Sequence, residues 1–111
     1  MKVTLAAIRR KYPHPRASHK SNSLPESYCV GGALCKFVGI ASRDSECFPS
    51  NESIREAWAK AMKIDWYTLR DKDRNEVRGI IGMLIGSNDA GRFKAAWMRL
   101  GKLLSWKPTH R

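Results

Sequence analysis

The cysteines and histidines of this chain are the residues with the clearest capacity for chemistry. Cys29, Cys35 and Cys47, together with His14 or His19, would supply enough side chains for a zinc site. Their C-x5-C-x11-C spacing, however, lacks the close cysteine pair that is typical of structural zinc sites. We therefore expect no metal and no other cofactor.

Catalytic groups are equally hard to assemble from this sequence. A cysteine nucleophile needs an activating base, and the histidines lie in segments that we expect to be extended arms, where a catalytic geometry is difficult to hold. Cys29 and Cys35 fall in an apolar helical pattern and are expected to be small buried side chains. Asn88 and Asp89 are residue types that cap helix N-termini, here that of the last helix. We expect that the protein is not an enzyme.

The tryptophans suggest binding rather than catalysis, because stacking of a base on an exposed aromatic ring contributes about 1–3 kcal/mol. Trp58 and Trp97 fall on apolar stripes and are expected in the core. Trp66 and Trp106 are less constrained by the periodicity. They are our candidate aromatic contacts.

The net charge of +11 is concentrated at the two ends of the chain. Residues 1–20 and 90–111 each hold six lysines or arginines and no acidic residue, whereas residues 21–89 are nearly balanced. Acid-free ends predict a surface that attracts nucleic acid or an acidic protein. The candidate binding residues are cationic: Arg9, Arg10, Lys11, Arg16, Lys20, Arg92, Arg99, Lys102 and Lys107.

The elements that must position these residues belong to one domain, since 111 residues leave little room for a second. The apolar spacing predicts an all-α fold of four or five short helices. We expect a basic arm over residues 1–24 with a short helix at 3–11, a helical core over 25–105, and a basic tail over 106–111. Within the core we expect a helix at 27–39 that ends at Gly39 and a second helix that begins at Ser50 or Asn51. A turn near Asp65 should precede a third helix, which runs from 70 to Gly86 and has a solvated, charged start. The last helix is expected at 90–104.

Three cysteines cannot all pair within the chain, and the apolar start at residues 3–8 is too short for a signal peptide. No apolar stretch approaches the roughly 20 residues that a membrane-spanning helix needs. We therefore expect a cytoplasmic protein without a membrane partner.

Two short segments resemble parts of small bacterial and phage proteins of uncharacterised function. The segment from Tyr28 to Cys35, YCVGGALC, is similar to their aromatic-Cys-x-x-Gly-Ala-Leu motif, and Ser87-Asn88-Asp89 is similar to their late Asn-Asp before a closing helix. The resemblance covers roughly residues 27–39 and 80–104. It implies a helical domain and no particular activity.

Two functions remain open from the sequence. The first is a helical module that binds the phosphate backbone of nucleic acid with little sequence specificity. The alternative is a phage-type interaction protein or inhibitor, such as a counter-defence protein, that binds an acidic or nucleic-acid-binding protein. Both use the same basic surface.

Overall fold

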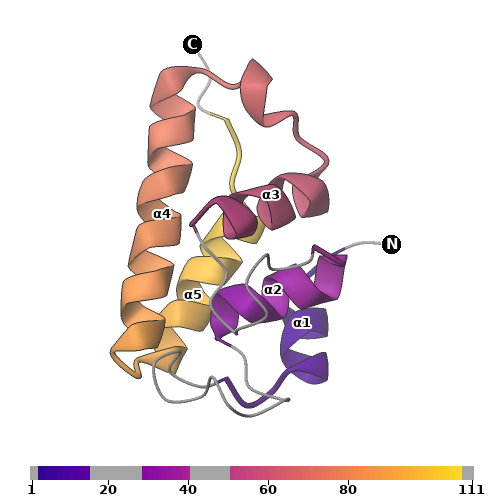
Figure 1. Ribbon diagram of the computed structural model, residues 1–111, viewed down its shortest axis with the longest axis vertical. Helices are drawn as coiled ribbons and strands as arrows, with labels where there is room; N and C mark the ends of the chain where they lie inside the picture. Colours follow the sequence, from indigo (N-terminus) through magenta and orange to yellow (C-terminus); the bar gives the residue numbers. More distant parts are fainter. Residues whose placement is uncertain (1–2, 16–28, 41–50, 109–111) are drawn as a thin grey trace.

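The fold is all-α across the residues that the computed structural model describes, which are 3–15, 29–40 and 51–108. The elements are α1 (Leu5–Lys11), α2 (Val30–Val38), α3 (Asn51–Met62), the short 3-10 helix η2 (Trp66–Thr68), α4 (Asp71–Asp89) and α5 (Phe93–Leu104). Figure 1 shows α4 and α5 running antiparallel, with α2 and α3 packed beside them and α1 below α2. The predicted fold class is confirmed.

Helix α1 belongs to the core and does not project as an arm. Thr4 begins the helix, because its Oγ1 accepts a hydrogen bond of 3.1 Å from the backbone N–H of Ala7. Ile8 is fully buried among the helices that α1 contacts, α2 and α5. The short helix expected at residues 3–11 is therefore present, but it packs against the core helices and is not part of a separate arm.

Both ends of α2 are explained by local chemistry. The sulfur of Cys29 accepts a hydrogen bond from the N–H of Gly32, so this buried cysteine acts as the N-cap. At the other end Gly39 adopts the left-handed conformation, with φ of +80°, as its position after the apolar pattern predicted. Cys35 is buried within the helix, so the prediction of buried cysteines is confirmed for both.

Helix α2 approaches α3 closely at Gly31. A Cβ atom at this position would lie only 2.5 Å from Cδ1 of Ile54, a side chain that is itself fully buried. Because any side chain at this position would displace Ile54, glycine is favoured at the contact in spite of its low helix propensity. The sequence-based expectation that another element packs against this backbone is confirmed at Gly31.

Helix α4 continues past Gly86, where we expected it to end, and stops at Asp89. Gly91, with φ of +77°, then reverses the chain into α5. Asn88 therefore lies within the last turn of α4, is 1% exposed, and its Oδ1 accepts the N–H of Val30 at 3.0 Å. Asn88 caps the start of α2, not of α5, so the prediction that it caps the last helix is wrong.

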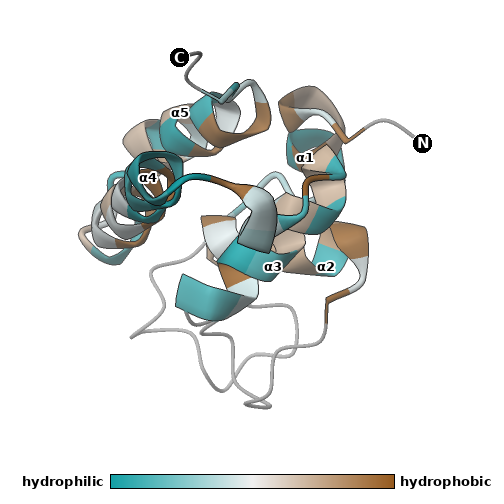
Figure 2. Ribbon diagram, turned by 90° about the horizontal axis from the view of Figure 1, so that it is seen from above, coloured by the Kyte–Doolittle hydropathy of each residue, from teal (hydrophilic) through white to brown (hydrophobic). Residues whose placement is uncertain are grey.

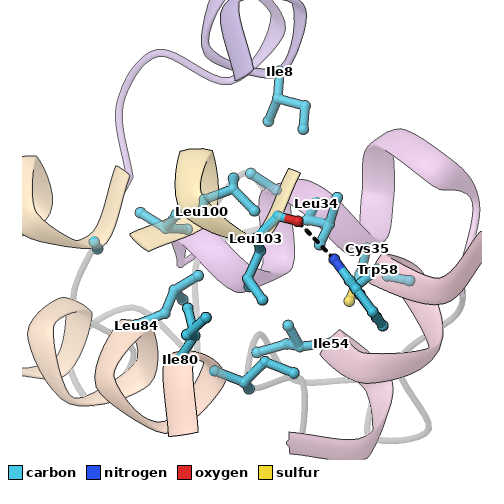
Figure 3. Close-up of a cluster of buried hydrophobic side chains, with 14 of the residues drawn as sticks. Ile8, Leu34, Cys35, Ile54, Trp58, Ile80, Leu84, Leu100 and Leu103 are labelled. Atoms are coloured by element: carbon cyan, nitrogen blue, oxygen red, sulfur yellow. Dashed lines mark hydrogen bonds between the residues drawn. The ribbon is translucent and has the colours of Figure 1, made fainter. Parts of the chain in front are cut away.

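Trp58 of α3 lies at the centre of the core. Figure 3 shows its indole nitrogen directed at the backbone of α5, where it donates a hydrogen bond of 2.8 Å to the carbonyl of Leu103. Trp66 and Trp106 meet the Trp58 ring edge-on, with centroid distances of 6.2 and 5.5 Å. These contacts tie α3, η2 and the segment after α5 together.

Candidate nucleic-acid interface

Contacts between α1 and α5 place the described parts of the two basic segments next to each other. Leu5 packs against Gly101, where an added Cβ would lie 3.1 Å from Leu5 Cδ2. The guanidinium carbon of Arg9 lies 5.4 Å from the centroid of the Trp97 ring, a cation–π contact that holds Arg9 against α5. Figure 2 shows α5 and α1 side by side at one edge of the molecule, with α3 on the other side. Residues far apart in the sequence thus share one surface.

The outward face of α5 carries cations around an exposed methionine. Lys94, Met98 and Lys102 follow one another at four-residue spacing, which places them on one face of a helix, and all three are exposed. Met98 is 67% exposed, whereas Leu100 on the opposite face is fully buried. This face combines positive charge with a flexible apolar side chain.

The predicted cationic residues are mostly accessible. In the described ranges, Arg9, Arg10, Lys11, Arg92, Lys102 and Lys107 are exposed and Arg99 is partly buried. Arg16 and Lys20 lie outside the described residues. Lys94 was missed as a candidate, although its position two helical turns before Lys102 already placed it on the outward face.

The described acidic residues lie outside α1, α2 and α5, although α4, which carries four of them, packs against α5. In the parts of the chain that the structure describes, α1, α2 and α5 contain no acidic residue, and the acids lie on α3, on α4 and just before η2: Glu52, Glu56, Asp65, Asp71, Asp73, Glu76 and Asp89. Asp73 is only 3% exposed, in contrast to the solvated face expected for the start of α4. The ion pair between Arg74 and Asp71 also lies on α4. We call the cations that α1 and α5 contribute the α1–α5 surface: Arg9, Arg10 and Lys11 from α1, and Lys94, Arg99 and Lys102 from α5.

The start of α5 adds to the positive potential. Arg92 is the N-cap residue and makes no side-chain capping hydrogen bond, and Lys94 lies in the first turn, which contains no acid. Cations at a helix N-terminus oppose the helix dipole and cost about 0.3–1 kcal/mol each. The same arrangement, however, reinforces the attraction of an approaching anion.

The two candidate aromatic contacts are not on this surface. Trp66 and Trp106 are only 5% and 6% exposed, because both pack edge-on against Trp58. Two guanidinium groups, of Arg55 and Arg78, lie over the Trp66 ring, and the Trp106 indole donates to Glu76 Oε1 at 2.7 Å. The interpretation of these rings as exposed stacking platforms is wrong.

Three other kinds of functional feature have little structural basis among the described residues: a reactive Cys35 thiol, a metal site and a membrane-spanning helix. Burial raises the pKa of the Cys35 thiol to about 12, with smaller contributions from Cys29 and Glu56, so this thiol stays protonated at neutral pH. No cluster of three or more His, Cys, Asp or Glu side chains that could hold a metal ion occurs among the residues described; Cys47 and His19 lie outside them. None of the described helices has the length and apolar character needed to cross a bilayer.

Comparisons with protein-family models, with curated protein sequences and with solved structures found no match. The function of this chain therefore has to be inferred from its own surface chemistry.

Proposed function

We propose that the protein binds nucleic acid through the α1–α5 surface, by contacts to the phosphate backbone and with little sequence preference. The observation that supports this most directly is the distribution of charge: most of the described cations at the two ends of the chain lie on α1 and α5, which contact each other, while the described acids lie on other elements. A surface whose own helices carry cations and no carboxylates attracts a polyanion.

The arrangement fits a phosphate backbone better than it fits base edges. Lys94 and Lys102 are two turns apart, about 12 Å along α5, so the two cations can contact different phosphates of one strand. Between them Met98 offers no hydrogen-bonding group to a base, and the neighbouring Arg99 is partly buried. Contacts of this kind position a protein on nucleic acid without specifying sequence.

The proposal is tested by fluorescence anisotropy with labelled single-stranded and duplex DNA and RNA, titrated from about 50 to 300 mM salt. The test variant is Lys94→Gln/Arg99→Gln/Lys102→Gln. Its matched control, Lys60→Gln/Arg70→Gln/Lys72→Gln, removes the same charge from exposed positions of α3 and at the start of α4. Both triple variants reduce the net charge equally, so any difference between them reports the location of the charge.

For the wild type we expect binding with a steep salt dependence. In the test variant the slope of log K against log salt should become shallower by up to about 2.7 for a duplex, or about 0.9 for each phosphate that the protein no longer neutralises. The control variant should keep most of the wild-type slope. Equal losses of affinity in the two variants would contradict a localised interface.

Absence of binding to every nucleic acid at low salt would overturn the proposal. A pull-down with and without nuclease then becomes decisive, because a protein partner survives the digestion whereas a bridging nucleic acid does not. An acidic partner that is captured after digestion, and no longer captured by the α5 test variant, would replace nucleic acid as the ligand of the same surface.

The cytoplasmic location expected from the cysteines remains a prediction.

A further inference from the structure

A second cationic feature lies away from the α1–α5 surface, where the start of α3 meets the middle of α4. A pocket of about 250 Å³ is lined here by Asn51, Glu52, Arg55, Arg78 and Ile81. This volume is below the roughly 300–1,000 Å³ of sites that enclose drug-sized ligands, and it suits a small group. The two arginines come from different helices, so the pocket depends on the tertiary fold.

The two guanidinium groups are held by the same aromatic ring. The Cζ atoms of Arg55 and Arg78 lie 4.9 and 5.2 Å from the centroid of the Trp66 ring, which is itself fixed by burial against Trp58. Their separation is therefore no larger than about one Debye length, ~10 Å at 0.1 M salt. Two like charges at this distance repel each other, and an anion placed between them relieves that repulsion.

Carboxylates do not neutralise these arginines in the described structure. Neither Arg55 nor Arg78 forms an ion pair with a described residue, and the polar contact of Arg78 is a long one of 3.4 Å from Nη1 to Asn75 Oδ1. Glu52 lines the pocket, but it is exposed and makes no ion pair with Arg55, three residues along the same helix. The lining side chains thus carry a net charge of one unit positive.

We propose that this pocket binds a phosphate group, held between the guanidinium groups of Arg55 and Arg78. Guanidinium groups that stack on an aromatic ring keep their edge N–H groups available, and the planar fork matches phosphate oxygens in bidentate geometry. The N–H groups in the first turn of α3 favour an anion at the same place. The site is separate from the α1–α5 surface and does not depend on the function proposed for it.

The test is isothermal titration calorimetry of the full chain with inorganic phosphate and with a nucleoside 5′-monophosphate. We expect saturable binding that falls by at least about ten- to a hundredfold in Arg55→Gln/Arg78→Gln, because the loss of even one charge-assisted hydrogen bond has an effect of that order. The double variant Lys60→Gln/Arg70→Gln is the matched control, because it removes the same charge from exposed positions outside both the pocket and the α1–α5 surface, and it should bind phosphate as the wild type does. Circular dichroism on each variant establishes that it is folded.

A gain-of-binding variant separates this proposal from simple loss of structure. Glu52→Gln removes the carboxylate from the pocket lining and should tighten phosphate binding several-fold, a result that a damaged fold cannot produce. Absence of saturable binding in the wild type, equal binding in Arg55→Gln/Arg78→Gln, or no gain in Glu52→Gln would each overturn the proposal.

The source of the phosphate is distinguished by a pair of oligonucleotides with a 5′-phosphate or a 5′-hydroxyl group. They are measured in the background of the α5 triple variant, so that the α1–α5 surface contributes little. Preference for the 5′-phosphate that disappears in Arg55→Gln/Arg78→Gln assigns the pocket to a nucleic-acid end. Equal binding of the two oligonucleotides, with free phosphate still bound, assigns it to small phosphate compounds.

Discussion

Replacement of Gly31 by alanine measures how tightly α2 packs on α3. The added methyl group would lie 2.5 Å from Cδ1 and 3.0 Å from Cγ1 of Ile54, well inside the usual carbon–carbon separation of about 3.5–4.0 Å. Since Ile54 is fully buried, it cannot swing into solvent to make room. Overpacking of this kind costs about 1–3 kcal/mol, and alanine recovers at most about 1 kcal/mol through its helix propensity.

We therefore expect Gly31→Ala to lower the free energy of unfolding by about 1 kcal/mol, or the melting temperature by about 4 °C. Gly82→Ala is the matched control, because Gly82 lies in the middle of α4 with nothing within 4 Å of an added Cβ. This control should gain about 0.5–1 kcal/mol from helix propensity alone. Urea denaturation followed by circular dichroism at 222 nm, a standard helix signal, compares the two.

The cause of the destabilisation is tested in the background of Ile54→Val, which removes the Cδ1 atom. In that background Gly31→Ala should cost about 1 kcal/mol less than in the wild type, the coupling expected of two residues in direct contact. If Gly31→Ala is as stable as Gly82→Ala, or if its cost is the same with valine at position 54, the close approach of the two helices is not as described.

Two further predictions concern buried polar groups. Asn88→Ala removes the acceptor of the Val30 N–H and should destabilise the fold by about 1–3 kcal/mol. Asn75→Ala, at an exposed position of the same helix, should cost less than about 0.5 kcal/mol. Equal losses of stability in urea denaturation would contradict the capping role of Asn88. For Cys35, the pKa is raised by burial from 9.0 to about 12, so between these values the unfolded chain releases a proton that the folded chain keeps. The free energy of unfolding of the wild type should therefore fall as the pH rises above 9, by up to about 1.4 kcal/mol per pH unit more than that of Cys35→Ala. If the free energies of unfolding of the two proteins change in parallel with pH, this prediction is wrong.

The helices were predictable from the sequence to the extent that local chemistry determines them. The apolar spacing from Val77 to Ile85 identified α4, and Gly39 marked the end of α2 because a left-handed residue favours glycine at that position. Asp65 starts a short helix as expected, since its side chain accepts the N–H of Tyr67.

The errors arose where a distant residue decides the outcome. Asn88 has the correct type for a helix cap, but the helix that it caps is 58 positions away in the chain, and no local pattern identifies such a partner. The same applies to Trp66, whose burial depends on Trp58 and on the two arginines over its ring, and to Trp106, which packs on Trp58 and donates to Glu76. Side-chain spacing shows that a group needs a partner, but it does not show which one.

The candidate site was predictable only where local spacing determines it. The sequence located the cations, and it identified the outward face of α5 from Arg99 and Lys102. It did not show that α1 packs against α5, because that contact depends on Ile8 being buried and on Gly101 leaving room for Leu5. The pocket between Arg55 and Arg78 was missed because an aromatic ring from a third element holds the two side chains.

The placement of the four tryptophans gives the protein two separate fluorescence reporters. Trp58, Trp66 and Trp106 form one cluster, and Trp66 lies beneath the arginines of the pocket. Trp97 instead contacts Arg9 at the junction of α1 and α5. A Trp97→Phe variant therefore leaves emission from the cluster alone, and the difference from the wild type isolates the signal at that junction. Binding at the two surfaces can then be followed without an attached dye.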